Sequence, residues 1–223
     1  MSFAVAIDGP AGAGKSTIAR AAAKELGFIY VDTGALYRSI GLNALRNNID
    51  INDANKVEKS LATLKVELSF DAQGAQIVLL NNEDVSSLIR TPEVSMAASR
   101  VSAIPAVRAF LLDLQRNMAK TQSVIMDGRD IGTVVLPDAE VKIFLTASPE
   151  IRAKRRFDEL IEKGQEVKYE DVLADVIQRD YNDSHREIAP LKPADDSTLA
   201  DTSNLTLQES VELIINIIKE NLK

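Results

Sequence analysis

The chain has 223 residues, of which 26 are Lys or Arg and 33 are Asp or Glu, so its formal net charge is −7. Its length suits one large domain or a core with a modest insertion. Such an acidic chain is a poor candidate for broad nucleic-acid binding, which needs clustered positive charge. The absence of cysteine excludes disulfides and thiolate metal sites, and a single histidine excludes clustered histidine metal sites.

The first seven residues lack the charged start and the long apolar core of a secretion signal. No uncharged apolar run reaches the roughly 18–20 residues that span a bilayer. We therefore expect a cytoplasmic protein that binds neither a membrane nor nucleic acid. No interface pattern stands out, and a monomer is the default expectation.

The first elements alternate between strand and helix. A buried strand is expected over residues 3–8, a glycine-rich loop over 9–14 and an Ala-rich helix over 15–26. A second strand at 28–31 ends at Asp32, and Thr33 is expected to cap a helix that runs toward Asn47. This order predicts an α/β fold with a parallel sheet flanked by helices.

The pattern then changes to an alternation of apolar and polar residues, which is typical of a strand with one wet face. It predicts three short strands, at 65–70, 76–80 and 85–89, separated by turns at 71–74 and 81–84. We interpret these strands as a small antiparallel insertion at about residues 62–90. The core is then formed by residues 1–61 and 91–223.

The rest of the chain returns to the α/β order. The expected elements are helices from Pro92 and from Pro105 to about Lys120, strands at 124–126 and 141–145, a cation-rich helix from Ser148, a helix at 170–187, a strand at 199–200 and a final helix capped by Thr206. The cation-rich helix forms part of a lid expected at about 148–166.

Residues 9–16 read Gly-Pro-Ala-Gly-Ala-Gly-Lys-Ser and match the phosphate-loop pattern G-x-x-x-x-G-K-[ST]. The segment follows a predicted strand and opens a helix, so its backbone N–H groups can surround phosphate oxygens. In this chemistry Lys15 reaches the β- and γ-phosphates and the Ser16 hydroxyl ligates Mg²⁺. The predicted ATP-binding residues are Gly9, Pro10, Ala11, Gly12, Ala13, Gly14, Lys15, Ser16 and Thr17. An ordinary glycine-rich turn is the alternative.

A phosphate loop alone does not separate a kinase from a switch GTPase or a remodelling ATPase. The chain lacks the guanine-reading N-K-x-D segment expected of a GTPase. A remodelling ATPase usually needs more chain for its coupling elements. Both observations favour a kinase.

Three further segments accompany the phosphate loop. They read Asp32-Thr33-Gly34-Ala35-Leu36-Tyr37-Arg38, Asp127-Gly128-Arg129-Asp130-Ile131-Gly132-Thr133-Val134-Val135 and Arg179-Asp180-Tyr181-Asn182-Asp183-Ser184-His185-Arg186. From about Val5 to Asp201 the chain resembles the cytidylate (CMP/dCMP) kinases in their longer bacterial form. The resemblance implies transfer of the γ-phosphoryl group of ATP to CMP or dCMP with Mg²⁺. It also places the antiparallel insertion in the region that binds the nucleoside monophosphate.

In the family that the chain resembles, the base is held by residues matching Ser99, Arg108 and Asp130. The assignment makes chemical sense, because a carboxylate accepts from the exocyclic amino group of cytosine while Arg and Ser satisfy its ring acceptors. Uracil has a carbonyl group in place of that amino group and would face Asp130 as acceptor against acceptor. UMP is therefore expected to be the poorer substrate.

The sugar and phosphate contacts implied by the resemblance are Arg38, Arg129, Arg179, Asp183 and Arg186. Helical spacing lets one face present the last three of these, while a surface salt bridge is the alternative for Arg179 and Asp183. A hydroxyl contact to the acceptor phosphate is assigned to Thr33. Tyr37 either packs near the acceptor or belongs to the core.

Charge stabilisation during transfer is assigned to Lys15, Arg129, Arg186 and the lid residue Arg156. The lid also carries Arg152 and Arg155, and a solvated helix face is the alternative for each lid arginine. Asp127 follows an apolar strand, so it resembles the carboxylate that orients Mg²⁺ beside Ser16. Asp32 is the alternative for that duty.

Two rival functions stay open at this stage. One is a phosphate-loop kinase with another acceptor, such as UMP, dTMP or shikimate. The other is a regulatory module that binds ATP and CMP without transferring phosphate.

Overall fold

The structure is a computed structural model and describes residues 2–73 and 75–222. The chain forms two compact units: Phe3–Phe28 with Ile125–Lys223, and Ile29–Val124. The predicted turn residue Gly74 lies outside the described residues.

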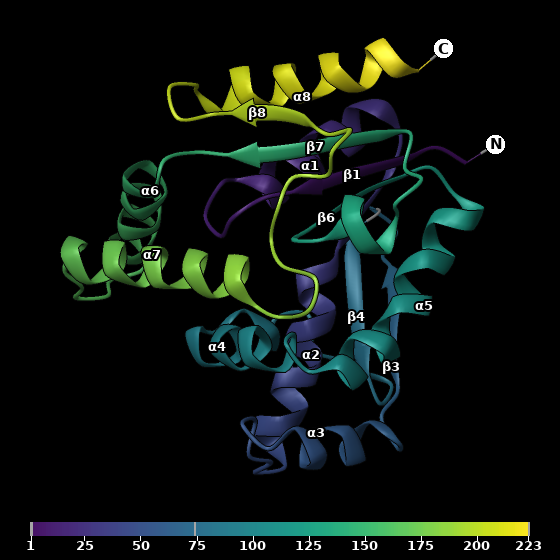
Figure 1. Cartoon of the computed structure of the whole chain (residues 1–223), viewed down its shortest axis with the longest axis vertical. Helices are drawn as coiled ribbons and strands as arrows, with labels where there is room; N and C mark the ends of the chain where they lie inside the picture. Colours follow the sequence, from purple (N-terminus) through teal and green to yellow (C-terminus); the bar gives the residue numbers. More distant parts are fainter. Residues whose placement is uncertain (1, 74, 223) are drawn as a thin grey trace. The chain divides into compact units, whose positions relative to one another are not determined.

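The elements of the first unit include those that carry the phosphate loop (Figure 1). They are β1 (Ala4–Asp8), α1 (Lys15–Leu26), β6 (Val124–Gly128), the π-helical turn η2 (Ile131–Val135), β7 (Val141–Thr146), α6 (Pro149–Glu162), α7 (Tyr169–His185), β8 (Thr198–Asp201) and α8 (Leu207–Asn221). Within this unit α1 packs against α8, and α6 packs against α7.

The elements of the second unit are β2 (Ile29–Asp32), α2 (Thr33–Arg46), α3 (Ala54–Leu61), β3 (Val66–Phe70), β4 (Gln76–Leu80), β5 (Glu83–Asp84), the 3₁₀ turn η1 (Leu88–Arg90), α4 (Pro92–Val101) and α5 (Pro105–Thr121). Helix α3 was not predicted. Its signal is Asp53, whose carboxylate caps the helix by accepting the Lys56 N–H.

Two sheets account for the strands. Five strands form one sheet in the order β2-β6-β1-β7-β8, and β3-β4-β5 form the antiparallel sheet. In the large sheet β7 runs parallel to both β1 and β8. The predicted α/β class and the small antiparallel insertion are confirmed.

The third strand of the insertion is shorter than predicted: Glu83 and Asp84 pair with β4, and the Val85 N–H donates to the Val78 carbonyl before the pairing ends. The Ser86 hydroxyl, rather than a backbone carbonyl, accepts the Val78 N–H. Leu88 and Ile89 then donate back to the Val85 carbonyl. The chain therefore coils into η1 where a strand over 85–89 was expected.

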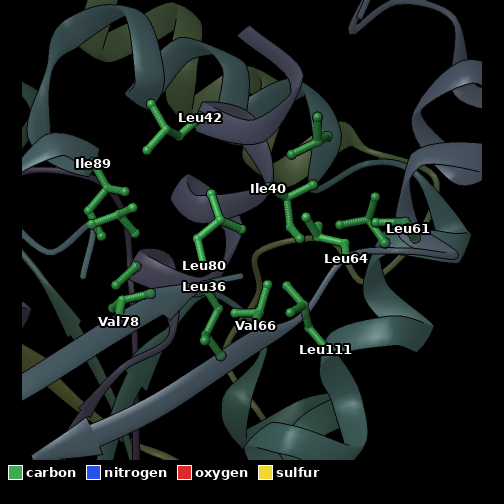
Figure 2. Close-up of a cluster of buried hydrophobic side chains, with 14 of the residues drawn as sticks. Leu36, Ile40, Leu42, Leu61, Leu64, Val66, Val78, Leu80, Ile89 and Leu111 are labelled. Atoms are coloured by element: carbon green, nitrogen blue, oxygen red, sulfur yellow. The ribbon is translucent and has the colours of Figure 1, made fainter. Parts of the chain in front are cut away.

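The core of the second unit joins the insertion to α2 (Figure 2). Val66, Val78 and Leu80 of the small sheet lie in one buried cluster with Leu36 and Ile40 of α2. Alternate residues of a strand share a face, so one face of β4 is committed to this cluster. The insertion is thus part of the core of its unit.

Two glycines of the phosphate loop are required by local geometry. Gly9 has φ +151°, and a Cβ at this position would lie 1.9 Å from the Leu145 carbonyl oxygen of β7. Gly14 precedes α1 with φ +87°, a left-handed conformation that favours glycine. The loop therefore lies directly against the sheet and turns sharply into α1.

Among the described residues, no single helix has the length and apolar character to cross a membrane. Helices α4 and α5 satisfy that test only when taken together, and they are bent by 100° relative to each other.

Candidate active site

The predicted phosphate loop adopts the expected strand–loop–helix arrangement. Lys15 is the first residue of α1 and is buried, and its Nζ donates to the Pro10 carbonyl oxygen at 2.7 Å. Burial, together with a smaller effect of the Arg129 charge, lowers the pKa of Lys15 to about 7, while Asp127, Asp8 and Asp183 oppose the shift. A phosphate in this loop would supply the negative charge that favours the ammonium form.

Ser16 and Asp127 come together although 111 residues separate them. The Ser16 Oγ donates to the Asp127 Oδ2 at 3.0 Å, and Asp127 is buried near the end of β6. Both groups are hard oxygen donors of the kind that Mg²⁺ prefers. Within residues 2–73 and 75–222, no three or more acidic or histidine side chains gather into a metal cluster.

The alternative carboxylate, Asp32, is occupied by other groups. Its Oδ1 accepts the Ala35 N–H at 3.0 Å and so caps α2, and its Oδ2 accepts from Arg38 at 2.7 Å. The predicted cap was Thr33, which is instead the first helical residue and is buried. Asp is as good a cap as Thr, and here one residue both ends β2 and begins α2.

Two ion pairs link the D-G-R-D segment to the region around the end of α7. The Arg129 Nε donates to the Asp183 Oδ2 at 2.8 Å, and Arg186 donates to the Asp130 Oδ1 at 3.4 Å. Burial alone would raise the pKa of Asp183, but Arg129, Arg179 and Arg186 outweigh it and hold that pKa below its usual value. Asp183 therefore stays ionised among three guanidinium groups.

The placement of Arg186 differs from the prediction. Helix α7 ends at His185, and Arg186 has extended backbone angles (φ −64°, ψ 142°). Its Nε donates to the Ala189 carbonyl at 2.6 Å. Arg179 and Asp183 lie on the helix, whereas Arg186 reaches Asp130 from the segment that follows it.

Asp8 is a site residue that sequence reasoning missed. Its buried carboxylate accepts the N–H groups of Ile131 at 2.8 Å and Gly132 at 2.7 Å. These N–H groups begin η2, immediately after Arg129 and Asp130. Burial raises the pKa of Asp8 to about 6, although the two N–H bonds oppose the rise. Asp8 thus ties the strand before the phosphate loop to the D-G-R-D segment.

Two arginines of the second unit engage the Asp32 carboxylate. Arg38 and Arg90 both donate to its Oδ2, at 2.7 and 3.3 Å. The buried Nε of Arg38 has no hydrogen-bond partner among the residues that the structure describes. An unsatisfied guanidinium donor suits an anionic ligand. Arg90 was not predicted, and its signal is a cation at the end of the insertion, just before the Thr91-Pro92 helix start.

The predicted base readers divide between the units. Ser99 is half-buried on α4 and Arg108 half-buried on α5, whereas Asp130 belongs to the first unit. Arg108 donates to the Ser102 carbonyl at 3.3 Å, and its guanidinium lies 5.9 Å from the centre of the Tyr37 ring. Tyr37 is half-buried and packs against the buried cluster of Figure 2.

The three lid arginines have different environments. Arg152 is buried and donates to the Ala147 and Ala11 carbonyls and to Asp180. Arg155 donates to the Thr202 carbonyl at 3.0 Å. Arg156 is half-buried and pairs with Glu159 at 3.0 Å. Arg152 therefore links the phosphate loop to α7, whereas Arg156 pairs with an exposed side chain of its own helix.

Comparison with known proteins decides the family. The model of the family described as cytidylate kinase matches residues 5–220, nearly the whole chain. The chain belongs to the cytidylate kinase family. The expected activity class, a nucleoside monophosphate kinase acting on CMP and dCMP, is thereby confirmed.

Several curated relatives of the cytidylate kinase family cover the chain end to end. The cytidylate kinase of Caldicellulosiruptor saccharolyticus is 54% identical over 96% of this chain and 94% of its own length. That of Thermosipho melanesiensis is 48% identical over the full length of both chains. Among solved structures, an uncharacterized protein from Eubacterium ventriosum matches with a TM-score of 0.55 at 13% identity, covering 99% of each chain. The last likeness concerns the fold alone.

Proposed function

We propose that this cytidylate kinase transfers the γ-phosphoryl group of ATP to CMP or dCMP, with Mg²⁺, and that the predicted residues carry out the transfer. The observation that supports this most strongly is the set of paired charges beside the phosphate loop. Arg129 pairs with Asp183 and Arg186 pairs with Asp130, while the Arg129 and Asp183 charges act on Lys15. A nucleotide offers each of these groups a new partner of the right sign.

The proposed donor side consists of the phosphate loop. Residues 9–17 hold the ATP phosphates, with Lys15 neutralising charge on the transferred group. Ser16 and Asp127 would hold Mg²⁺ together with phosphate oxygens and water, since Mg²⁺ usually keeps several non-protein ligands. When bound there, the ion would neutralise charge on the phosphates of ATP. Asp127 is preferred over Asp32, because two guanidinium groups already engage Asp32.

The proposed acceptor side reads the nucleoside monophosphate. Asp130 accepts from the cytosine amino group, while Arg108 and Ser99 donate to its ring acceptors. The ribose hydroxyl is assigned to Asp183 and Arg179. The acceptor phosphate is assigned to the Thr33 hydroxyl and to the guanidinium groups of Arg38, Arg129 and Arg186, which can form charge-assisted hydrogen bonds.

Little covalent chemistry is needed from the chain in this reaction. In-line transfer needs two phosphates held face to face, cations around the moving group and exclusion of water. Lys15, Arg129 and Arg186 provide fixed positive charge, and Arg156 provides a cation on the lid helix. Four expectations stay predictions. They are the insertion at 62–90, the lid at 148–166, the cytoplasmic location and the monomeric state.

The test is ADP release by the purified protein with Mg·ATP and one acceptor at a time: CMP, dCMP, UMP, AMP, GMP, dTMP or shikimate. Strong turnover confined to CMP and dCMP is the expected result. Turnover mainly with another acceptor would overturn the roles given to Ser99, Arg108 and Asp130. Nucleotide binding without ADP release would support the regulatory-module rival.

A further inference from the structure

A glutamine begins the row of β4 residues that face the buried cluster. Gln76, Val78 and Leu80 alternate along the strand and therefore share one face. Val78 and Leu80 enter the cluster of Figure 2 with Leu36 and Ile40 of α2. Gln76 continues that row at the end of the strand, paired with Phe70 in the register, and is half-buried. A polar side chain on this face needs a specific partner.

That partner is the backbone of Asp32. The Gln76 Oε1 accepts the Asp32 N–H at 2.8 Å, and the Gln76 Nε2 donates to the Asp32 carbonyl oxygen at 3.2 Å. Asp32 is the last residue of β2, which stands at one end of the strand order of the large sheet. The side-chain amide therefore makes the two hydrogen bonds that a neighbouring strand would make. It holds both the N–H and the carbonyl group of Asp32.

The carboxylate of the same residue directs the acceptor-side cations. Asp32 caps α2 through the Ala35 N–H and accepts from Arg38 and Arg90. The side-chain exposure of Asp32 is 6% and that of Arg38 is 20%, so the pair is largely shielded from water. The Arg38 Nε, which has no hydrogen-bond partner within residues 2–73 and 75–222, belongs to this same group. A displacement of Asp32 would therefore move the guanidinium that has a free donor for phosphate.

We propose that Gln76 is a positioning residue of the acceptor-phosphate site: it clamps the Asp32 backbone, and Asp32 in turn orients Arg38. The antiparallel insertion then contributes to binding of the acceptor, because its strand β4 carries Gln76. The inference rests on the proposed role of Arg38 in holding the acceptor phosphate.

The test compares Gln76→Met, which keeps the length of the side chain without its amide, with Gln73→Met. Gln73 is an exposed glutamine of the same insertion and lies in the turn before β4. We expect Gln76→Met to raise KM for CMP about tenfold, because small misplacements of a binding group are costly. KM for ATP and the thermal midpoint are expected to match those of Gln73→Met. Equal rises in KM for both nucleotides, or no rise, would overturn the proposal.

Two further measurements keep the result decisive. Gln76→Ala serves as a second variant with the same expected split if Gln76→Met does not fold. In the Arg38→Ala background, Gln76→Met is expected to change KM for CMP less than twofold, since residues acting through one another are not additive. A full tenfold effect in that background would show that Gln76 acts elsewhere.

The single variant Arg38→Ala separates the acceptor-phosphate role of Arg38 from the positioning role of Gln76. If KM for CMP stays normal in Arg38→Ala, the acceptor role of Arg38 is wrong, and the positioning role of Gln76 falls with it. If Arg38→Ala is impaired while Gln76→Met behaves like Gln73→Met, the acceptor site stands and only the clamp is wrong.

Discussion

The Ser16 hydroxyl donates a hydrogen bond of 3.0 Å to the Asp127 carboxylate, joining the start of α1 to the end of β6. The contact brings the hydroxyl of the phosphate loop to the carboxylate of the next strand in the sheet order. Both residues were predicted to serve the metal, and the fold brings their side chains into contact. Their proximity gives the proposed metal site its two protein oxygens.

Asp127→Asn tests that site. The amide keeps the shape but removes the charge, so we expect a fall in kcat of about 100-fold and a higher Mg²⁺ concentration at half-maximal rate. The measurement is initial rate against Mg²⁺ at saturating ATP and CMP. The exposed Asp113→Asn serves as the control. An unchanged Mg²⁺ dependence would return Asp32 to consideration.

Lys15→Ala tests the catalytic cation. The lysine is expected to stabilise charge on the transferred phosphoryl group, so its loss should lower kcat by about 10³ or more. Lys24→Ala, on the exposed side of the same helix, should leave kcat unchanged. Circular dichroism checks that both variants fold. A mild loss for Lys15→Ala would exclude it from this role.

Asp130→Ala tests base reading. We expect kcat/KM for CMP to fall far more than kcat/KM for UMP, because only cytosine donates an amino hydrogen to the carboxylate. Loss of the Arg186 partner affects both substrates alike, since Arg186 is assigned to the phosphate. The ratio of the two losses is therefore the readout, with the exposed Asp138→Ala as control. Equal losses would show that another group reads the base.

Asp8→Asn tests how the buried Asp8 carboxylate makes the stability of the fold depend on pH. Its pKa rises from 3.8 to about 6 on folding, so the folded chain holds the proton more tightly than the unfolded chain. The contribution of Asp8 to stability is therefore lost as pH rises from about 4 to about 6. We expect the free energy of unfolding of the wild type to fall relative to Asp8→Asn by roughly 3 kcal/mol across that range. Urea unfolding at several pH values measures it, and a difference independent of pH would contradict it.

The lid arginines should separate by phenotype. Arg152→Met removes the buried partner of Asp180 and two carbonyl contacts, so we expect a loss of about 3 kcal/mol in the free energy of unfolding. Arg156→Met removes only an exposed pair with Glu159 and should change stability by less than about 1 kcal/mol. Its kcat should nevertheless fall if this arginine serves the transferred group. A normal kcat for Arg156→Met would favour Arg155.

Local patterns predicted most of the fold. The phosphate loop followed from the Gly and Lys spacing, and the α4 start followed from Thr91, which does cap the Val94 N–H. The strand over 85–89 was wrong, because a side-chain hydroxyl, that of Ser86, replaced a backbone acceptor. Alternation of residue types carries no information about such a substitution.

The missed site residues act over long sequence distances. Asp8 is 123 residues from Ile131, and Gln76 is 44 residues from Asp32. In the sequence, Asp8 resembled the end of an ordinary buried strand. Gln76 resembled the start of an ordinary strand with one solvent-exposed face. Their importance lies in partners that only the folded chain brings to them. The ion pair of Arg129 with Asp183 was hidden for the same reason, although both residues had been singled out.

Gly9, the first residue of the phosphate loop, is required by the packing of the fold. The backbone passes so close to the Leu145 carbonyl that even one methyl group has no room. The glycine is therefore demanded by the sheet before any nucleotide arrives. Any redesign of the loop for other phosphate donors must therefore retain Gly9, which belongs to the architecture of the fold.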